Sequence, residues 1–292
     1  MYIIKTIIEA LRPTILYTNK NLAFDSIIQS INTTDSRMYS TKENIIYDMI
    51  FESKFDLDLF NNNLNYDGFY ICLDKFDDIY NYEFINYFDY YIVKKSIFKP
   101  HFMILSDKQQ TIDSDNSISL RNFNNKFNIK PYLLPYEIID HPTFILNLCK
   151  EYPIKTYLEL GVRNSPIPKL IKNTVVSITG VDTSNINNFD GQFFRMTTDN
   201  FFNINKTTFD LIFIDACHDF EYVCKDFVNS LNHINENGII LLHDTYPANK
   251  LMTNTNVCSD SYRIVEYIKK NYKNLQILNI PISPGLCIVK RI

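Results

Sequence analysis

The residues best suited to chemistry follow two apolar runs in the second half of the chain. The run that begins at Leu211 ends in Asp215, with His218 three residues later, and a second run leads directly into His243 and Asp244. Both runs are predicted to be buried strands, and neighbouring parallel strands end at the same edge of a sheet. A carboxylate and an imidazole so close together suit metal binding or base catalysis, so we expect a functional site at this edge.

Two earlier strand ends indicate a binding site for an adenosine-containing ligand. The segment LELG places Glu159 and Gly161 at the end of one strand, and Ser165 before a proline is typical of a helix start. Asp182 ends the next strand about 20 residues after Gly161, where an acidic side chain can accept both hydroxyls of a ribose. Asp199 follows the third strand and suits the rim of an adenine site. Each of these features has an alternative interpretation. The glycine turn after the first strand is also common in α/β proteins that bind no such ligand, and Asp199 could lie in a solvated turn.

The elements that must position these residues alternate regularly after Pro131, which predicts a mostly parallel sheet covered by helices on both faces. Only Pro281–Gly285 separates the last two strands, too few residues for a crossover helix, so the final strand is expected to be antiparallel. The predicted strands are Thr156–Leu160, Val175–Val181, Phe193–Met196, Leu211–Asp215, Ile239–His243, Leu275–Ile280 and Leu286–Lys290. The predicted helices are Tyr136–Glu151, a short one from Pro166, Phe220–Ile234 and Ser259–Asn271.

The segment FDLIFIDACHDFEYVCKDFVNSLNHINENGIILLHDTYP resembles the second half of the class I S-adenosylmethionine-dependent methyltransferases. It is most similar to the group that has an I-D-x-x-H segment followed by H-D-T. That group resembles both the catechol-type O-methyltransferases and the metal-dependent macrolide-sugar O-methyltransferases. The resemblance covers about residues 135–292 and includes LELG and GVDTS. It implies a doubly wound, seven-stranded Rossmann-like α/β sheet with an antiparallel last strand.

The resemblance also implies how the cofactor S-adenosylmethionine is held. Glu159 and Gly161 would flank its methionine part, and Ser165 stands where the family has a second glycine of the binding loop. Asp182 would hold the ribose, and Asp199 would face the adenine amino group.

The catalytic residues implied by the resemblance are Asp215, His218 and Asp244. Asp215, which also borders the cofactor site, and Asp244 correspond to the carboxylates that bind Mg²⁺ or another divalent metal, and His218 corresponds to the general base. His243 belongs to the expected metal site but replaces a glutamate of the sugar enzymes, and a neutral imidazole binds Mg²⁺ less well than a carboxylate does. Thr245 stands where the catechol-type enzymes have an asparagine ligand.

These residues predict a metal-assisted O-methyltransferase that acts on a hydroxyl of a sugar or another polyhydroxylated small molecule. Two alternatives are a nicotinamide-dependent oxidoreductase and a non-catalytic binding or assembly protein that keeps the fold. The absence of a G-x-G-x-x-G motif counts against the oxidoreductase. Retention of Asp182, Asp215, His218 and Asp244 together counts against a non-catalytic protein. His101, His141 and His233 do not follow a strand end together with other candidate site residues. We expect His141 and His233 to be structural or on the surface.

The first half of the chain predicts a smaller α/β domain that resembles no family we can name. Its predicted strands are Thr14–Thr18, Ile45–Phe51, Phe69–Leu73, Tyr90–Val93 and Phe102–Leu105, with a helix around Leu22–Ile31. The polar stretch that follows has little periodicity and predicts a linker. We therefore expect an N-terminal domain at 1–107, a linker at 108–130 and a methyltransferase domain at 131–292.

Composition excludes several classes of partner. The chain of 292 residues has a formal net charge of -4 and no run of five or six basic residues, which argues against nucleic acid and anionic membranes as ligands. Its six scattered cysteines form no C-x-x-C pair and are expected to be reduced. No apolar stretch is long enough to span a bilayer, and Glu9 and Arg12 interrupt any signal-peptide pattern. We expect a cytoplasmic protein, and the sequence is compatible with a homo-oligomer. Its frequent use of amino acids with AT-rich codons is typical of an AT-rich genome, such as that of a large DNA virus.

Overall fold

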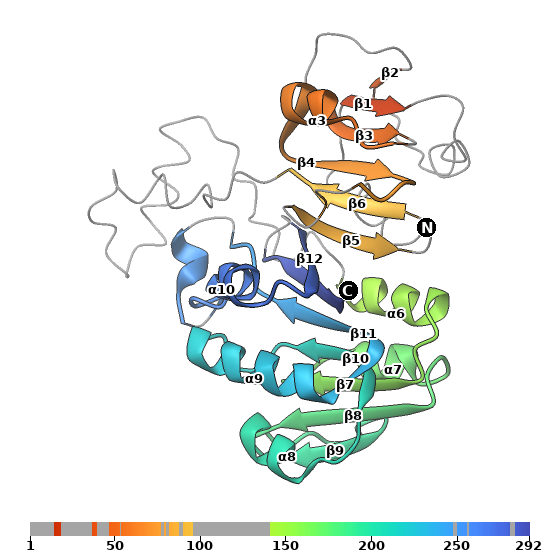
Figure 1. Ribbon diagram of the computed structural model, residues 1–292. Helices are drawn as coiled ribbons and strands as arrows, with labels where there is room; N and C mark the ends of the chain where they lie inside the picture. The colour runs from red at the N-terminus through yellow and green to blue at the C-terminus, as the bar shows by residue number, and fades with distance from the viewer. Residues whose placement is uncertain are drawn as a thin grey trace.

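The computed structural model describes residues 15–18, 37–39, 47–52, 54–76, 79, 82–87, 90–95, 141–247, 250–255, 257–280 and 284–292. Within these residues the strands form a single sheet in the order β2-β1-β3-β4-β6-β5-β12-β13-β11-β10-β7-β8-β9 (Figure 1). The N-terminal strands lie at one end of this sheet and the strands that carry the candidate site residues lie at the other. The expected smaller N-terminal α/β unit therefore continues the sheet of the C-terminal unit.

Seven strands make up the C-terminal half of the sheet, as the sequence predicts. β11, β10, β7, β8 and β9 are parallel, and β13 is antiparallel to both of its neighbours, β11 and β12. The prediction of an antiparallel final strand is therefore confirmed. The bounds are β7 Thr156–Leu160, β8 Ser177–Asp182, β9 Gln192–Arg195, β10 Phe209–Ile214, β11 Ile234–His243, β12 Leu275–Ile280 and β13 Leu286–Arg291.

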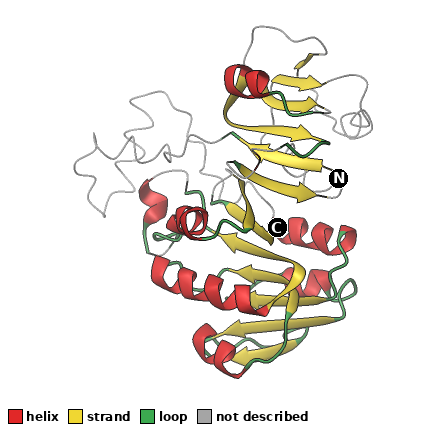
Figure 2. Ribbon diagram, viewed as in Figure 1, coloured by secondary structure: helices red, strands yellow, loops and turns green. Residues whose placement is uncertain are grey.

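Helices cover both faces of this half (Figure 2). On one face, α6 (His141–Glu151) and α7 (Ile167–Ile171) bury residues such as Phe144 and Ile167 against the sheet. On the other face, α8 (Thr198–Ile204), α9 (Phe220–His233) and α10 (Arg263–Asn271) bury Phe201, Phe227 and Ile264. A 3-10 helix, η2, spans Lys250–Thr253. The strands of this half are therefore buried on both faces, which explains their nearly continuous apolar sequences.

The N-terminal half contains β1 (Ile15–Thr18), β2 (Arg37–Tyr39), β3 (Tyr47–Glu52), β4 (Leu64–Cys72), β5 (Glu83–Tyr87) and β6 (Tyr90–Lys94). β1 to β4 are parallel to one another, whereas β6 is antiparallel to β4 and to β5. Because β5 is in turn antiparallel to β12, the parallel strands β1 to β4 run opposite to the parallel strands of the C-terminal half. α3 (Leu57–Asn63) packs on one face of this half, where Asp56 caps it by accepting from the Leu59 amide.

The two halves join where β5 lies beside β12. Phe84 pairs with Ile277, and the amide of Asn86 donates to the Gln276 side chain at 3.0 Å. The Glu83 carboxylate is buried at this seam, 3.9 Å from the buried Lys94 ammonium, and it also contacts the ammonium of Lys269 from α10. One hydrophobic core cluster contains residues of both halves, so packing as well as pairing holds them together.

The predictions agree with the structure for most of the C-terminal half and for fewer N-terminal elements. The expectations missed α3, α8, β2 and the seam strand β5. Helix α10 begins at Arg263, four residues later than predicted, because residues 257–262 form turns. The predicted strand Phe102–Leu105, the helix around Leu22–Ile31, the start of the helix at Tyr136 and the linker at 108–130 lie outside the described residues.

No helix among the residues that the structure describes is both long and apolar enough to cross a membrane.

Candidate active site

The centre of the site is formed at the ends of β10 and β11. These strands pair in parallel, so Asp215, directly after β10, and His243, the last residue of β11, reach the same edge of the sheet. The chain then turns from Asp215 toward α9, which brings His218 back to the edge. The two apolar runs thus place their polar ends side by side, as the sequence predicts.

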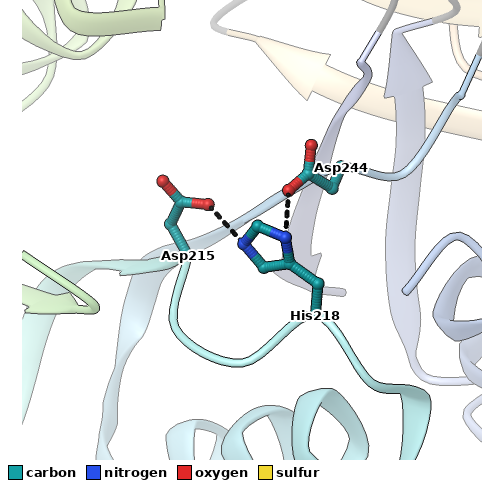
Figure 3. A group of neighbouring side chains, drawn as sticks. All are labelled: Asp215, His218 and Asp244. Carbon is teal, nitrogen blue, oxygen red and sulfur yellow. Dashed lines mark ion pairs between the residues drawn. The ribbon is translucent and has the colours of Figure 1, made fainter. Parts of the chain in front are cut away.

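His218 lies between two carboxylates (Figure 3). Its Nε2 atom is 3.5 Å from Oδ1 of Asp215, and its Nδ1 atom is 3.1 Å from Oδ2 of Asp244. The same Nδ1 atom also contacts the backbone carbonyl of Val257. These contacts fix the plane of the imidazole ring at the edge of the sheet.

His243 bridges the same two carboxylates from the strand side. Its Nδ1 atom is 3.1 Å from Oδ1 of Asp215 and 3.5 Å from Oδ1 of Asp244. Asp244 has a φ of 58°, in the left-handed region that few residues other than glycine adopt. A strained backbone at a buried acidic residue is typical of a functional site, since the surrounding contacts must hold it there.

A segment just before α10 holds Asp244 from a third direction. The Cys258 thiol donates to Oδ1 of Asp244 at 3.2 Å, and the Ser261 hydroxyl donates to the Asp244 carbonyl at 2.7 Å. Both Cys258 and Ser261 are buried. The side chain of Asp244 therefore has contacts from His218, His243 and Cys258.

The charges of this cluster compensate one another. Burial alone would raise the pKa of Asp215, but the adjacent His243 and His218 hold it well below its usual range. Burial alone would lower the pKa of His218, yet the carboxylates of Asp215 and Asp244 raise it to about 9. The pKa of His243 is likewise raised well above its usual value against the effect of burial. The imidazoles of His218 and His243 and the carboxylate of Asp215 therefore favour one another's charged forms.

Gly161 brings the loop after β7 close to this cluster. It has a φ of +86°, and a side chain there would collide with the backbone of Asp215 and Ala216. Glu159, two residues earlier on β7, is 1% exposed, and its Oε2 atom has no hydrogen-bond partner among the described residues. Burial raises the pKa of Glu159 to about 8, opposed by the hydroxyl of Ser165. An incompletely satisfied buried carboxyl beside a glycine turn is suited to a polar ligand.

Asp182 ends β8 beside the same loop. Its carboxylate accepts the backbone amides of Arg163 at 2.9 Å and Ser184 at 2.7 Å. Ser165 accepts the amide of Ile167 at 3.2 Å, so its hydroxyl helps to start α7. Glu159, Gly161, Ser165 and Asp182 therefore lie in or beside the loop between β7 and α7, and Asp182 links this loop to the next strand.

Two of the expected site residues lie apart from the cluster. Asp199 is in the first turn of α8, where its exposed carboxylate is 3.9 Å from the ammonium of Lys225. Thr245 is buried, and its hydroxyl donates to the side chain of Asn279 at 2.7 Å.

Two residues near the site, His141 and Cys258, were not predicted to belong to it. One histidine, His233, was predicted to be structural or on the surface. The ring of His141, at the start of α6, is buried and lies 4.6 Å from the ring of His243, whereas the sequence predicted only a structural or surface position for it. Cys258 was expected only as a buried reduced thiol, and its contact with Asp244 joins segments without a recognisable motif. His233 bonds to the carbonyl of Asn229 within α9, which agrees with a structural role. His101 lies outside the described residues.

The cluster has the donors of a metal site. Asp215, His218 and Asp244 each offer one ligand atom, and these atoms lie within 4.8 Å of one another. Two carboxylates and an imidazole are a common donor set for a divalent cation. The residues therefore fit a divalent metal, with His243 beside them.

Comparisons with known proteins gave one family match and several similar solved structures. A protein-family profile described as a methyltransferase domain, Methyltransf_24, matches residues 172–245. A search of curated protein sequences gave no match. Among solved structures, an O-methyltransferase from Bacillus cereus in complex with SAH is similar, with 15% identity and a TM-score of 0.43 over 65% of this chain and 96% of that chain. The O-methyltransferase TomG from Streptomyces achromogenes, in complex with SAM, has 10% identity and a TM-score of 0.41 over 65% and 95%.

A further solved structure is that of the MycE methyltransferase from the mycinamycin biosynthetic pathway, in complex with Mg and SAH. It has 14% identity and a TM-score of 0.36 over 47% of this chain and 45% of that chain. The profile match includes β8 to β11 and ends at Thr245, so it covers the strands that deliver Asp182, Asp215 and Asp244. The match and the strand order of the sheet thus indicate that the C-terminal half of the chain contains a methyltransferase domain with a Rossmann-like α/β fold.

Proposed function

We propose that the protein is an O-methyltransferase that transfers the methyl group of S-adenosylmethionine to a hydroxyl of a sugar or another polyhydroxylated small molecule, assisted by a divalent metal. The observation that carries this proposal is the convergence of Asp215, His218 and Asp244, with ligand atoms within 4.8 Å, beside the Gly161 loop. The resemblance of the I-D-x-x-H and H-D-T segments to those of sugar-modifying enzymes supports this class of acceptor.

The cofactor is proposed to lie over the loop between β7 and α7. The buried Glu159 would face its methionine part, and Asp182 would accept the ribose hydroxyls with the lone pairs that Arg163 and Ser184 leave free. Asp199 at the start of α8 would lie at the adenine end. Because Gly161 contacts Asp215, a methyl group over this loop would face the cluster.

Methyl transfer from a sulfonium is an in-line displacement in which the acceptor oxygen forms a bond to the methyl carbon as the bond from carbon to sulfur breaks. The protein must align the hydroxyl with the methyl group and remove its proton. His218 would accept that proton in its neutral form, which predominates above the raised pKa of about 9, with Asp215 and Asp244 holding the ring on either side. Asp215 and Asp244 would hold a divalent metal, which when bound would supply positive charge at the site and polarise the hydroxyl.

Ligand-induced stabilisation tests the cofactor part of the proposal. S-adenosylmethionine or S-adenosylhomocysteine should raise the melting temperature of the full chain, and NAD should not, since only a ligand that binds the folded state stabilises it. Stabilisation by NAD alone would instead support an oxidoreductase.

Transfer of a labelled methyl group tests the reaction itself. A panel of sugars and other polyols is offered with labelled S-adenosylmethionine, before and after treatment with EDTA. Labelled acceptor that requires Mg²⁺ or Mn²⁺ for its formation would support the whole proposal. Transfer to a nitrogen or carbon acceptor alone would contradict the O-methyltransferase assignment.

A further inference from the structure

We propose that Asn279, a buried amide on β12, is a positioning residue of the candidate active site, because it binds Thr245 and thereby holds the neighbouring Asp244 in place against His218. This inference rests on the proposed function, in which Asp244 is one of the two carboxylates that hold the metal. It gives the last pair of strands a part in the site, although Asn279 itself acts through Thr245.

The contact between Asn279 and Thr245 is reciprocal. The Thr245 hydroxyl donates to Oδ1 of Asn279 at 2.7 Å, and Nδ2 of Asn279 donates to the Thr245 carbonyl at 3.3 Å. Both residues are buried. A side chain that accepts from the hydroxyl and donates to the carbonyl of one residue fixes the side chain and the backbone of that residue together.

The position of Asn279 in the sheet shows how far this contact reaches. β12 is separated from β11 by β13, and in the register of these strands Cys287 of β13 pairs with Asn279 on one side and with Leu242 on the other. The amide therefore binds across a whole strand to the segment that follows β11. Its neighbours Leu278 and Ile280 are buried and apolar. A buried amide in such a strand costs free energy unless its polar atoms are bonded, and Thr245 supplies a bond for each.

The backbone that follows Asp244 depends on such contacts. Asp244 has a φ of 58°, in the left-handed region, and a residue stays there when its surroundings hold it. The Ser261 hydroxyl donates to the Asp244 carbonyl at 2.7 Å, and Asn279 holds the next carbonyl, that of Thr245. Two side chains from distant segments therefore fix two successive carbonyls on the C-terminal side of Asp244.

The orientation of Asp244 matters because its carboxylate has a specific partner. Its Oδ2 atom is 3.1 Å from Nδ1 of His218 (Figure 3). A rotation of the backbone at Asp244 would break this contact and move one of the two carboxylates that would hold the metal. Residues that orient metal ligands in this way typically change metal affinity by about 10–100-fold when they are removed.

Binding of Mn²⁺ to the full chain, measured by electron paramagnetic resonance of the free ion, tests the inference without an activity assay. Thr245→Val keeps the branched side chain but loses the hydroxyl and should weaken Mn²⁺ binding about tenfold, whereas Thr245→Ser keeps the hydroxyl and should bind as wild type does. Val289→Ala is the matched control, because it removes buried apolar contacts from β13 further from the site edge. It should lower the melting temperature and leave the Mn²⁺ affinity unchanged.

A double variant tests whether Asn279 acts through Thr245. Asn279→Leu alone should weaken Mn²⁺ binding about as much as Thr245→Val does, and the two changes together should weaken it no further, because both remove the same contact. Additive weakening in the double variant would overturn the inference.

A crystal structure of metal-free Thr245→Val gives a result that depends on no metal. Asp244 should leave its left-handed conformation, or its Oδ2 atom should move away from Nδ1 of His218. An unchanged Asp244 in this structure, or wild-type Mn²⁺ affinity in Thr245→Val, would overturn the inference and leave the proposed function intact. Failure of the wild type to bind Mn²⁺ would instead contradict the metal part of the proposed function, and the crystal structure would then decide the inference by itself.

Discussion

The two halves of the sheet use the same α/β construction and differ in what their strand ends carry. In the C-terminal half, parallel strands end in Asp182, Asp215 and Asp244, which meet at one edge. In the N-terminal half, β1 to β4 are also parallel, but they run in the opposite direction, so their carboxyl ends lie at the other edge of the sheet. The N-terminal half thus adds a second group of parallel strands to the same sheet without adding their carboxyl ends to the site.

The buried charges of the two halves differ in the same way. At the seam, the Glu83 carboxylate lies beside the ammonium groups of Lys94 and Lys269. At the site, Asp215 and Asp244 are neutralised by imidazoles, which can lose a proton. The seam thus pairs a carboxylate with ammonium groups, and the site pairs carboxylates with imidazoles. Substitutions at the seam, at the site and at a third buried carboxylate can measure what each pairing contributes.

The largest effect is expected at the site. His218→Ala should lower kcat by about 10²–10⁴-fold because the general base is lost, and the affinity for S-adenosylmethionine should stay the same. His233→Ala, on the far end of α9, is the control and should leave kcat within about twofold. Steady-state kinetics and calorimetry measure the two quantities. If His218→Ala kept wild-type activity, the imidazole of His218 would not be the general base.

The next largest effect is expected at the seam. Glu83→Ala leaves the buried Lys94 without this carboxylate and should lower the free energy of unfolding by about 3–5 kcal/mol. Urea denaturation measures this change, and Glu151→Ala, at the exposed end of α6, should change it by less than about 0.5 kcal/mol. Two separate transitions in Glu83→Ala would show that residues 131–292 fold alone. An unchanged free energy would mean that the seam contributes little.

Asp226 is a buried carboxylate outside the cluster of Asp215, His218, His243 and Asp244. A substitution there shows what a buried carboxylate costs in stability when no imidazole balances its charge. Burial raises the pKa of Asp226, on α9, to about 7, so above this pH the folded state carries a buried charge. Between about pH 4 and 7 the folded protein binds more protons than the unfolded chain, so stability falls as the pH rises.

Asp226→Asn should therefore raise the free energy of unfolding by about 2–4 kcal/mol near pH 8 and leave it nearly unchanged near pH 4. Glu221→Gln, an exposed change on the same helix, should show no such difference between the two pH values. Equal effects of Asp226→Asn at both pH values would contradict the raised pKa.

The smallest effect is expected at the cofactor loop. Asp182→Ala should weaken the binding of S-adenosylmethionine by about 1–3 kcal/mol, because charge-assisted hydrogen bonds to the ribose are lost. Asp190→Ala, which removes only a surface ion pair with Lys172, is the control and should leave the affinity unchanged. Equal affinities of Asp182→Ala and wild type in calorimetry would place the ribose elsewhere.

Sequence patterns predicted the C-terminal half well because its strands are continuous apolar runs that end in charged residues. The same patterns missed β5, since EFINY lies in a long aromatic stretch without clear turns. They also missed α8, because a threonine before an aspartate, as at its N-cap Thr197, is as typical of a turn as of a helix start. Both elements depend on tertiary contacts or a cap rather than on periodicity.

The sequence predicts those site residues that directly follow an apolar strand. It does not predict the residues that reach the site through contacts between distant segments. Asp215, His218 and Asp244 are marked by the apolar runs before them. Cys258 reaches Asp244 only because a turn folds back before α10, and His141 reaches His243 across the sheet edge from α6. Neither segment has a spacing or composition that indicates such a contact.

A crystal structure of the full chain with S-adenosylhomocysteine tests the central claim most directly. We expect the ribose hydroxyls on Asp182, the amino acid part beside Gly161, and the sulfur directed toward the cluster of Asp215, His218 and Asp244. A ligand bound away from the loop between β7 and α7, or a sulfur that points away from His218, would contradict the account.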